Sequence, residues 1–469
     1  MLPMTCESIP FEPPQGWEAL LRVATTQPFA AVFDSAASGA LGTRSFVSFA
    51  PIMLLQCTGQ TATWQRGRNA SRLEGDPLEV FERIERFTHQ ECPLREPFTG
   101  KGFYGGWAGL LGYDLRCFIE KLSPPKPEGP WFPDLQAGFY AWTLCLEHST
   151  RQCELRLLNG APAGPEDIRK LAADLTELFS SEPNAATASA GTKKTLLTDR
   201  ETWLQQVSTV QRHIHDGDIY QANLTRMVRH TGDFDGSALY AVLRHENPAP
   251  FGGYLDCGEG RGILSSSPER FLSVSGRLIE TRPIKGTRPR SPDTAEDKRL
   301  RDELLVSEKD RAELTMIVDL ERNDLGRVCK PGTVKVPSLL HAESYQRVHH
   351  LEATVCGVLR DDITPVQFMR ATFPGGSISG APKKRALEII HDLEPVRRGP
   401  YTGSMFWLTP DGRFESNILI RTILRDTMGV SYHVGCGIVA DSDPAAEWDE
   451  SEAKGAALAS AIDKYAGSR

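Results

Sequence analysis

Long apolar runs are missing from this sequence, and so are the signals of export. No segment approaches the roughly 18 consecutive apolar residues that a membrane-spanning helix needs. The opening residues, MLPMTCESIPFEPP, contain neither the basic nor the apolar region of a secretory signal peptide. The ten cysteines include no Cys-x-x-Cys pair, which favours buried reduced thiols over a disulfide framework or a zinc site. We therefore expect a soluble cytoplasmic protein.

Basic clusters are also lacking. The chain has 53 lysines and arginines against 61 aspartates and glutamates, a net charge of −8, which argues against nucleic acid or an anionic membrane as the main partner. With 469 residues, 40% of them hydrophobic, it can bury a large core, and its length suggests two or three domains. The small polar stretch at 180–194 is the clearest linker. We expect an N-terminal segment at 1–180, a linker at 181–197 and a second region at 198–469.

Residues 265–290 (SSSPERFLSVSGRLIETRPIKGTRPR) carry the densest group of reactive side chains. Phe271–Val274 and Arg277–Glu280 are strand-like runs. Ser275–Gly276 between them predicts a two-residue hairpin turn.

In that register Glu269 and Lys285 both lie toward the open end of the hairpin. They are about three residues, or ~10 Å, apart along the ladder. An odd offset in a regular ladder would direct the two side chains to opposite faces. Because Pro268 and Pro283 interrupt a regular ladder, the spacing leaves open whether the two groups converge.

Lys285 is a candidate nucleophile. Arg282, Arg288 and Arg290 are close to it in sequence. Neighbouring cations and burial both lower the pKa of a lysine, and only the neutral amine is nucleophilic. A solvated basic loop explains the same composition, and from composition alone it is the commoner case.

Further patterns predict local structure. Residues 295–320 have a helical period, with Lys309 and Glu313 spaced as a surface ion pair. Thr198 with Glu201 predicts a capping box that opens another helix.

Two more charged groups stand out near the C-terminus. Residues 417–424 alternate like a strand around Arg421, which is costly to bury without a carboxylate partner. Glu450 and Lys454 are spaced for ordinary helix support.

Several motifs together resemble one enzyme family. From about Thr198 to near the C-terminus the chain contains, in order, SPERF, PIKGT, DRAE…VDLERNDLGRV, PGGSISGAPKKRALEII, Tyr-Thr-Gly, IRT and GIVADSDPAAEWDESEAKG. This order is similar to that of chorismate-utilising enzymes, which include anthranilate, isochorismate, salicylate and aminodeoxychorismate synthases; the N-terminal resemblance is weaker. The resemblance implies a large α+β sandwich of two facing β-sheets with outer helices, in which N-terminal and C-terminal segments interweave.

Two positions distinguish branches of that family. Lysine at 285 resembles the aminodeoxychorismate synthases, whereas anthranilate synthases usually have alanine there. Gln221 stands where isochorismate and salicylate synthases usually have a lysine that activates water. The resemblance therefore implies conversion of chorismate and ammonia to 4-amino-4-deoxychorismate, on the route to 4-aminobenzoate and folate. Anthranilate synthase component I and a non-catalytic chorismate- or tryptophan-binding regulatory subunit remain as alternatives.

The same resemblance implies roles for individual residues. It assigns catalysis to Lys285, Glu269 and His350, and two magnesium-binding carboxylates to Glu313 and Glu450. It assigns contacts with the substrate to Gly286, Thr287, Ser377, Tyr401, Arg421, Gly437 and Lys454. Since the chain has no evident glutaminase region, we expect ammonia from a separate glutamine amidotransferase subunit.

A tryptophan pocket is a further expectation. Asn247–Phe251 (NPAPF) is similar to a segment near the tryptophan-binding pocket of the amine-adding branches. Asp34, Ser35 and the run 45–51 would form its N-terminal half. A proline-bounded loop also explains the segment.

Overall fold

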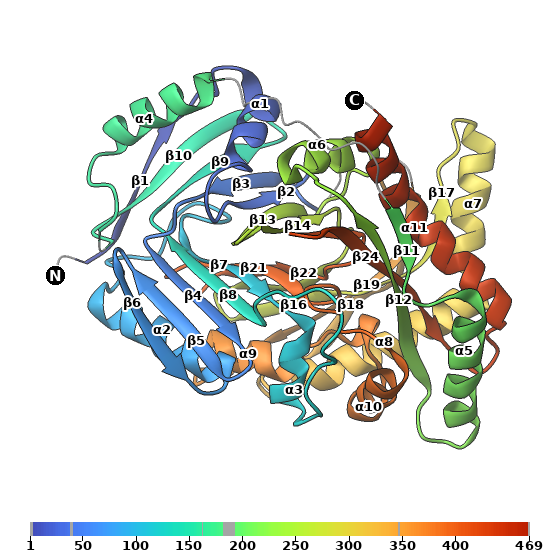
Figure 1. Ribbon diagram of the computed structural model, residues 1–469. Coiled ribbons are helices and arrows are strands. Elements are labelled where there is room, and N and C mark those ends of the chain that lie inside the picture. Colours follow the sequence, from blue (N-terminus) through green and yellow to red (C-terminus); the bar gives the residue numbers. More distant parts are fainter. Residues whose placement is uncertain (1–2, 38–40, 162, 182–192, 346–347, 468–469) are drawn as a thin grey trace.

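Two large antiparallel β-sheets face each other and carry helices on their outer sides (Figure 1). The computed structural model describes residues 3–37, 41–161, 163–181, 193–345 and 348–467. Within these residues each sheet has twelve strands. The expected α+β sandwich is thereby confirmed.

The first sheet, sheet I, contains one long path of strands and one short side strand. Its order is β1 (Thr5–Pro10), β10 (Gln152–Asn159), β9 (Trp142–Glu147), β3 (Arg44–Ser48), β2 (Ala31–Asp34), β13 (Gly252–Gly258), β14 (Arg261–Ser265), β23 (Thr422–Asp426), β24 (Gly429–Ile438), β12 (Gln221–Thr231) and β11 (Lys193–Leu196), with β20 (Gly380–Ala381) also paired to β12.

The second sheet, sheet II, is built in the same way. Its order is β17 (Ile284–Pro289), β19 (Val348–Val358), β16 (Leu278–Arg282), β15 (Arg270–Ser275), β22 (Phe414–Asn417), β21 (Ser404–Leu408), β7 (Gly106–Leu111), β8 (Leu135–Tyr140), β4 (Met53–Thr58), β5 (Thr61–Arg66) and β6 (Asn69–Glu74), with β18 (Lys335–Ser344) also paired to β19.

N-terminal and C-terminal strands are continuous in both sheets. In sheet I the join is between β2 and β13, where Phe33 lies opposite Gly253. In sheet II it is between β21 and β7, where Ser404 lies opposite Leu111. Apolar side chains from both parts pack between the sheets, among them Phe46, Leu255 and Trp407. The two parts of the chain therefore share one core, as expected.

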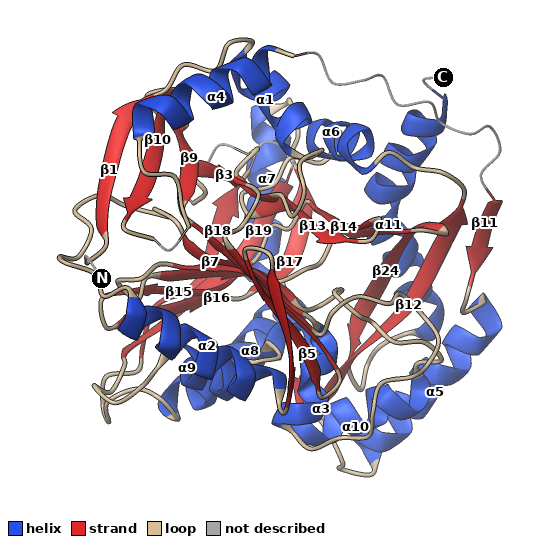
Figure 2. Ribbon diagram, turned by 60° about the vertical axis from the view of Figure 1, so that its left-hand side comes forward, coloured by secondary structure: helices blue, strands red, loops and turns tan. Residues whose placement is uncertain are grey.

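Helices cover the outer faces, as the turned view also shows (Figure 2). Their bounds are α1 (Gly16–Ala24), α2 (Pro77–Glu91), α3 (Arg116–Ile119), α4 (Ile168–Ser180), α5 (Arg200–His215), α6 (Gly236–Glu246), α7 (Thr294–Val306), α8 (Glu308–Gly326), α9 (Pro365–Thr372), α10 (Lys383–Leu393) and α11 (Pro444–Gly467), with 3₁₀ turns η1 (Tyr113–Leu115) and η2 (Gly376–Ile378). Helices α1, α4, α6 and α11 pack on sheet I, whereas α2, α8 and α9 pack on sheet II. Helices α5 and α10 cover the β12–β24 end of sheet I. None of these described helices is both long enough and apolar enough to cross a bilayer.

Two predicted strand features differ in the structure. The hairpin between β15 and β16 turns at Gly276–Arg277, with Ser275 opposite Leu278, because Gly276 adopts a positive φ of 60°. The predicted strand at 417–424 is interrupted between β22 and β23, where Arg421 has a φ of 50° that a continuous strand does not accommodate.

Two predicted helix features also differ. The single helix expected at 295–320 is two helices, since Ser307 ends α7 and its side chain accepts the Asp310 N–H that starts α8. The cap of α5 is Asp199 rather than Thr198, because the Asp199 carboxylate accepts the Thr202 N–H at 2.8 Å.

The division of the chain at 181–197 stays a prediction. Residues 182–192 lie outside the described residues. At the end of the same segment Lys193–Leu196 form β11, which pairs with β12 at the edge of sheet I.

Candidate active site

A cavity of about 510 Å³ opens between the two sheets. Strands β17 and β19 of sheet II, β24 of sheet I, and helices α8 and α11 contribute to its walls. All of the residues predicted to form the site line this one cavity: Glu269, Lys285, Gly286, Thr287, Glu313, His350, Ser377, Tyr401, Arg421, Gly437, Glu450 and Lys454. The structure thus brings together residues from nine separate parts of the chain, counted as 269, 285–287, 313, 350, 377, 401, 421, 437 and 450–454.

Glu269 and Lys285 converge on Ser377. The Ser377 hydroxyl donates to Glu269 Oε1 at 2.7 Å, and Lys285 Nζ donates to the Ser377 main-chain oxygen at 3.1 Å. Glu269 lies just before β15, whereas Lys285 lies on β17 beyond the break at Pro283. The break frees Lys285 from the β15–β16 ladder and pairs it with Leu351 of β19 instead. This answers the question that the spacing alone left open.

Burial sets the protonation states of both groups. Burial raises the pKa of Glu269 to about 7, although the Ser377 hydrogen bond and nearby Lys285 partly oppose this shift. Burial lowers the pKa of Lys285, while Glu313 and Glu269 oppose that shift. Glu269 can therefore hold a proton near neutral pH, and Lys285 loses its proton more readily than an exposed lysine.

The neighbouring arginines do not act on Lys285 as the sequence suggested. Arg282 pairs with Glu280, Arg288 with Glu303, and Arg290 with Asp297, at 2.7, 2.8 and 2.7 Å. Each guanidinium charge is thereby balanced by a carboxylate. The downward shift of the Lys285 pKa comes from burial, with a smaller contribution from Lys454.

His350 is a neutral member of the cavity wall. Its Nδ1 lies 3.0 Å from the Thr287 hydroxyl, and its Nε2 has no hydrogen-bond partner among the described residues. Burial, together with Arg421, lowers the pKa of His350 to about 3. The ring can therefore orient a ligand, but it is not a proton donor at neutral pH.

Arg421 supplies an unbalanced positive charge. Its guanidinium lines the cavity, and no hydrogen bond or ion pair joins that guanidinium to any described residue. Burial lowers the pKa of Arg421, and no carboxylate opposes this effect. The missing carboxylate partner is therefore one that a ligand can provide.

Carboxylates gather at the α8–α11 end of the cavity. Glu313 projects from α8, and Glu447 and Glu450 project from α11. Lys309 Nζ lies 3.8 Å from Glu447, and Lys454 Nζ lies 2.7 Å from Glu450 and 3.2 Å from the Gly435 oxygen. Both lysines therefore neutralise part of this negative charge.

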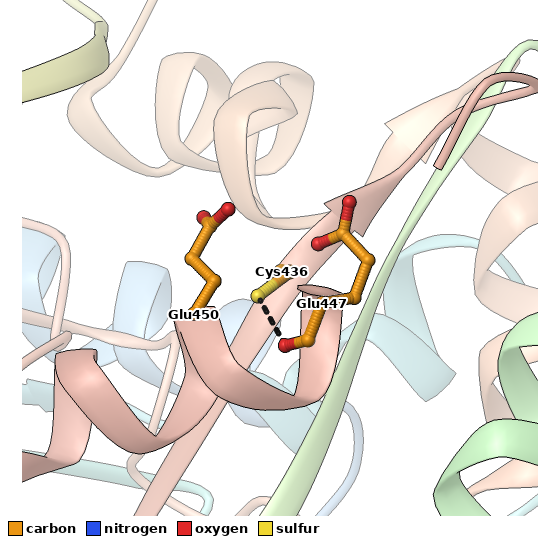
Figure 3. Close-up of side chains that lie close together, drawn as sticks. All are labelled: Cys436, Glu447 and Glu450. Atoms are coloured by element: carbon orange, nitrogen blue, oxygen red, sulfur yellow. Dashed lines mark hydrogen bonds between the residues drawn. The ribbon is translucent and has the colours of Figure 1, made fainter. Parts of the chain in front are cut away.

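The donor set at this end suits magnesium. Donor atoms of Cys436, Glu447 and Glu450 lie within 4.8 Å of one another, and Glu313 lines the same cavity outside that group. Figure 3 shows the carboxylates of Glu447 and Glu450 on the same side of α11, while the Cys436 thiol donates to the Glu447 main-chain oxygen at 3.5 Å. Magnesium prefers carboxylate oxygens to sulfur. The carboxylates fit this ion and the thiol does not.

The lining residues that the sequence did not predict include Glu447, His433 and Asn223. Glu447 lies three residues before Glu450, so the spacing of the acidic motif could have indicated it. His433 shares a strand face with Gly437, and Asn223 lies opposite Gly437 across the β12–β24 ladder. His433 is buried and stacks on Tyr401 with ring centroids 5.0 Å apart.

A second cavity of about 650 Å³ lies elsewhere between the two halves of the chain. Asp34 and Ser35 line it together with Pro250 and Phe251, so the two segments expected to form an amino-acid pocket do meet. The Asp34 carboxylate accepts the Ser45 hydroxyl at 2.9 Å and pairs with Arg244. Further lining comes from Phe46 and Trp407, which make the wall partly aromatic.

Comparisons with known proteins identify relatives along most of the chain. Residues 33–460 match the family described as chorismate binding enzyme. An anthranilate synthase component I-like protein of Synechocystis is 41% identical over 82% of this chain and 79% of its own. Aminodeoxychorismate synthase component 1 of Klebsiella aerogenes is 36% identical over 96% of this chain and 97% of its own. The crystal structure of anthranilate synthase component I from Streptococcus pneumoniae superposes with a TM-score of 0.77 at 26% identity, covering 88% of this chain and 91% of that one.

Proposed function

The chain belongs to the chorismate binding enzyme family, and within it we propose that the protein converts chorismate and ammonia to 4-amino-4-deoxychorismate, the precursor of 4-aminobenzoate in folate biosynthesis. Membership in this family makes the chain an enzyme rather than a non-catalytic regulatory subunit. The observation that carries the proposal is the placement of Lys285. Its amine lies in the cavity wall, has a lowered pKa and is joined through Ser377 to the acid Glu269.

Two cationic groups would hold the carboxylates of chorismate. Arg421 has no carboxylate partner among the described residues, so a substrate carboxylate would balance it. Lys454, which lines the same cavity, would take the second. Thr287, Gly286 and the neutral His350 would orient the ring between them, with Tyr401 and Gly437 completing the wall.

Glu313, Glu450 and the additional Glu447 would hold a magnesium ion. When bound, magnesium supplies positive charge that binds a substrate carboxylate and stabilises negative charge developing nearby. Glu447 also accepts the Ser442 hydroxyl at 2.7 Å, which fixes its orientation.

The proposed chemistry has two displacements. Lys285 Nζ forms a bond to ring carbon C2 while the two conjugated double bonds shift and the C4–oxygen bond breaks. Glu269 donates its proton to the departing hydroxyl, which leaves as water, and the resulting carboxylate takes a proton from the new ammonium. Ammonia then bonds to C4, the double bonds shift back, and the C2–nitrogen bond breaks with its electron pair returning to Lys285, which Glu269 protonates. The new C4 ammonium gives up one proton, which restores the acid form of Glu269.

Gln221 supports ammonia, rather than water, as the nucleophile that attacks C4. An amide is not a base, so this position cannot activate water as an amine would. Gln221 packs under Gly437, where an added Cβ would lie only 2.1 Å from its side-chain nitrogen. Ammonia would come from a glutamine amidotransferase subunit, which matches the name "component 1" of the Klebsiella relative.

Product analysis tests this function. Purified protein would be incubated with chorismate, magnesium and ammonium at alkaline pH, with an aminodeoxychorismate lyase added to half of the sample. We expect 4-aminobenzoate only in the half with lyase. Anthranilate in the half without lyase would instead assign the activity named for the Synechocystis and Streptococcus relatives. If free ammonium gives no product, adding the glutaminase subunit with glutamine decides between a required partner and an inactive protein.

We also propose that the second cavity binds tryptophan. Its aromatic wall suits an indole ring, and the Ser35 and Asp34 region supplies polar groups for an amino acid. Titration calorimetry with L-tryptophan is expected to show one site per chain. Equal heats with L-alanine, or none with L-tryptophan on protein freed of bound amino acid, would contradict this proposal.

A further inference from the structure

A buried carboxyl group lies directly behind the wall that carries Ser377. Glu321 is on α8, two turns after Glu313, and is only 2% exposed. Its Oε1 accepts the main-chain N–H of Gly376 at 3.1 Å. Its Oε2 has no hydrogen-bond partner among the described residues. Glu321 does not line the cavity, so a ligand cannot be what holds it there.

The turn η2 lies flush against α8 at this contact. A Cβ added to Gly376 would lie 2.7 Å from the Leu320 side chain and 3.2 Å from Glu321 Oε1. Both distances are shorter than ordinary carbon contacts, so only glycine allows this approach. On the far side of the turn the Ser379 hydroxyl donates to the Gly375 oxygen at 2.8 Å. The turn is therefore fixed both internally and by Glu321.

We propose that Glu321 is a positioning residue for the reaction: by holding Gly376 it places Ser377 between Glu269 and Lys285. The chain of contacts runs from Glu321 Oε1 to the Gly376 N–H, and from the next residue to both reacting groups at 2.7 and 3.1 Å. This role deepens the proposed function and rests on it, since it concerns the same acid and the same amine.

The charge state of Glu321 agrees with such a role. Burial raises the pKa of Glu321, and Asp324 and Glu269 add to the shift, while Lys383 and the Gly376 N–H oppose it. Lys383 is engaged by Asp324 at 2.5 Å. The raised pKa favours the neutral carboxyl, and the contact with the Gly376 N–H needs an acceptor oxygen rather than a charge. Glutamine offers the same oxygen at the same length.

The first experiment measures the reactivity of Lys285 without any substrate. Wild type, Glu321→Gln and Glu321→Met would be acetylated with limiting acetic anhydride across a pH series, and Lys285 labelling would be followed by peptide mass spectrometry. Losing the Ser377 oxygen and the Ser377–Glu269 bond destabilises the Lys285 ammonium. We therefore expect the labelling profile of Glu321→Met to move to lower pH by up to about one pKa unit. Glu321→Gln is expected to match wild type.

The control variant is Asp319→Asn on the same helix. Its carboxylate pairs with Arg322 at 2.8 Å on the exposed face. It should change neither the labelling profile nor turnover. Should Glu321→Met fail to fold, Gly376→Ala displaces the same turn by a different route and is expected to give the same direction of shift.

The second experiment is a double-mutant cycle with turnover as its readout. We expect kcat to fall about tenfold in Glu321→Met with KM for chorismate nearly unchanged, because Arg421 and Lys454 are untouched. Combined with Ser377→Ala, the two losses should be less than multiplicative, since both variants weaken the Ser377–Glu269 hydrogen bond. A wild-type labelling profile in Glu321→Met, an equal shift in Glu321→Gln, or multiplicative losses would overturn the proposal. Because the labelling needs no chorismate, its outcome is independent of which product the enzyme makes.

Discussion

Glu269 lies just before β15 and Lys285 lies on β17, yet both reach Ser377, one through its hydroxyl and the other through its main-chain oxygen. An acid and an amine held on one residue act on the same region of a bound ligand. The proposed mechanism needs a proton for the leaving group and a nucleophile for the ring. The two contacts with Ser377 fix the relative position of the acid and the amine before substrate binds.

Replacing the nucleophile should stop turnover without unfolding the protein. For Lys285→Ala we expect kcat to fall by roughly 10³-fold or more, because the variant lacks the amine that forms the covalent bond. Intact mass of wild type quenched during turnover should show an adduct of chorismate less one water, which the variant should lack. Lys384→Ala, an exposed lysine on α10, is the matched control. Full rate in Lys285→Ala would refute a covalent step.

The raised pKa of Glu269 makes stability depend on pH in a defined direction. Its ordinary pKa of 4.5 rises to about 7 in the folded state, so between these values the folded state binds more protons than the unfolded state. The free energy of unfolding from this group therefore falls as pH rises from about 4.5 to 7 and is constant above. Glu269→Gln removes that loss and should be more stable than wild type at pH 8 by up to about 3 kcal/mol.

Thermal unfolding at pH 5 and pH 8 measures this effect. The stability gain of Glu269→Gln should be present at pH 8 and small at pH 5, while its activity is lost at both. Glu415→Gln serves as a comparison, because Glu415 is also a carboxyl of sheet II but is paired with Arg270 at 2.6 Å. A gain of equal size at both pH values would show that Glu269 is not the group responsible.

We expect Arg421 to strengthen chorismate binding and to lower the stability of the folded protein. Arg421→Met is expected to raise KM for chorismate by about 10- to 100-fold, the range of one charge-assisted hydrogen bond. The same change should raise the melting temperature, because it removes a partly buried cation without a carboxylate partner among the described residues. Calorimetric binding and a melting curve measure the two effects. Arg322→Met, on the exposed face of α8, should change neither KM nor the melting temperature. Unchanged chorismate binding by Arg421→Met would exclude the proposed contact with a substrate carboxylate.

Much of the fold could be predicted from local apolar patterns in the sequence, and much of the candidate site could be predicted from its dense motifs. The apolar spacing of α2, with Leu78, Phe81 and Ile84 buried, is an example of the first kind. The PIKGT and DRAE motifs are examples of the second.

The features that could not be predicted from the sequence depend on single backbone conformations and on long-range packing. The positive φ of Arg421 breaks a run whose composition alternates like a strand, and nothing local indicates it. Glu321 had no signal of function, since its partner Gly376 is 55 residues away and meets it only when α8 packs under η2. Convergence of Glu269 and Lys285 likewise required the β17–β19 pairing.

Metal binding should depend on all three carboxylates at the α8–α11 end. For Glu313→Gln, Glu447→Gln and Glu450→Gln we expect weaker magnesium binding, by about tenfold or more each, since each replaces an ionised oxygen donor by a neutral one. Binding of manganese, followed by electron paramagnetic resonance in the absence of chorismate, measures this directly. Asp449→Asn, an exposed carboxylate on α11 that lies outside the cavity lining, is the matched control. Cys436→Ala should leave magnesium affinity unchanged, because the thiol is not a ligand this ion prefers. Unchanged manganese binding in Glu447→Gln would remove this residue from the ligand set and leave the Glu313–Glu450 pair.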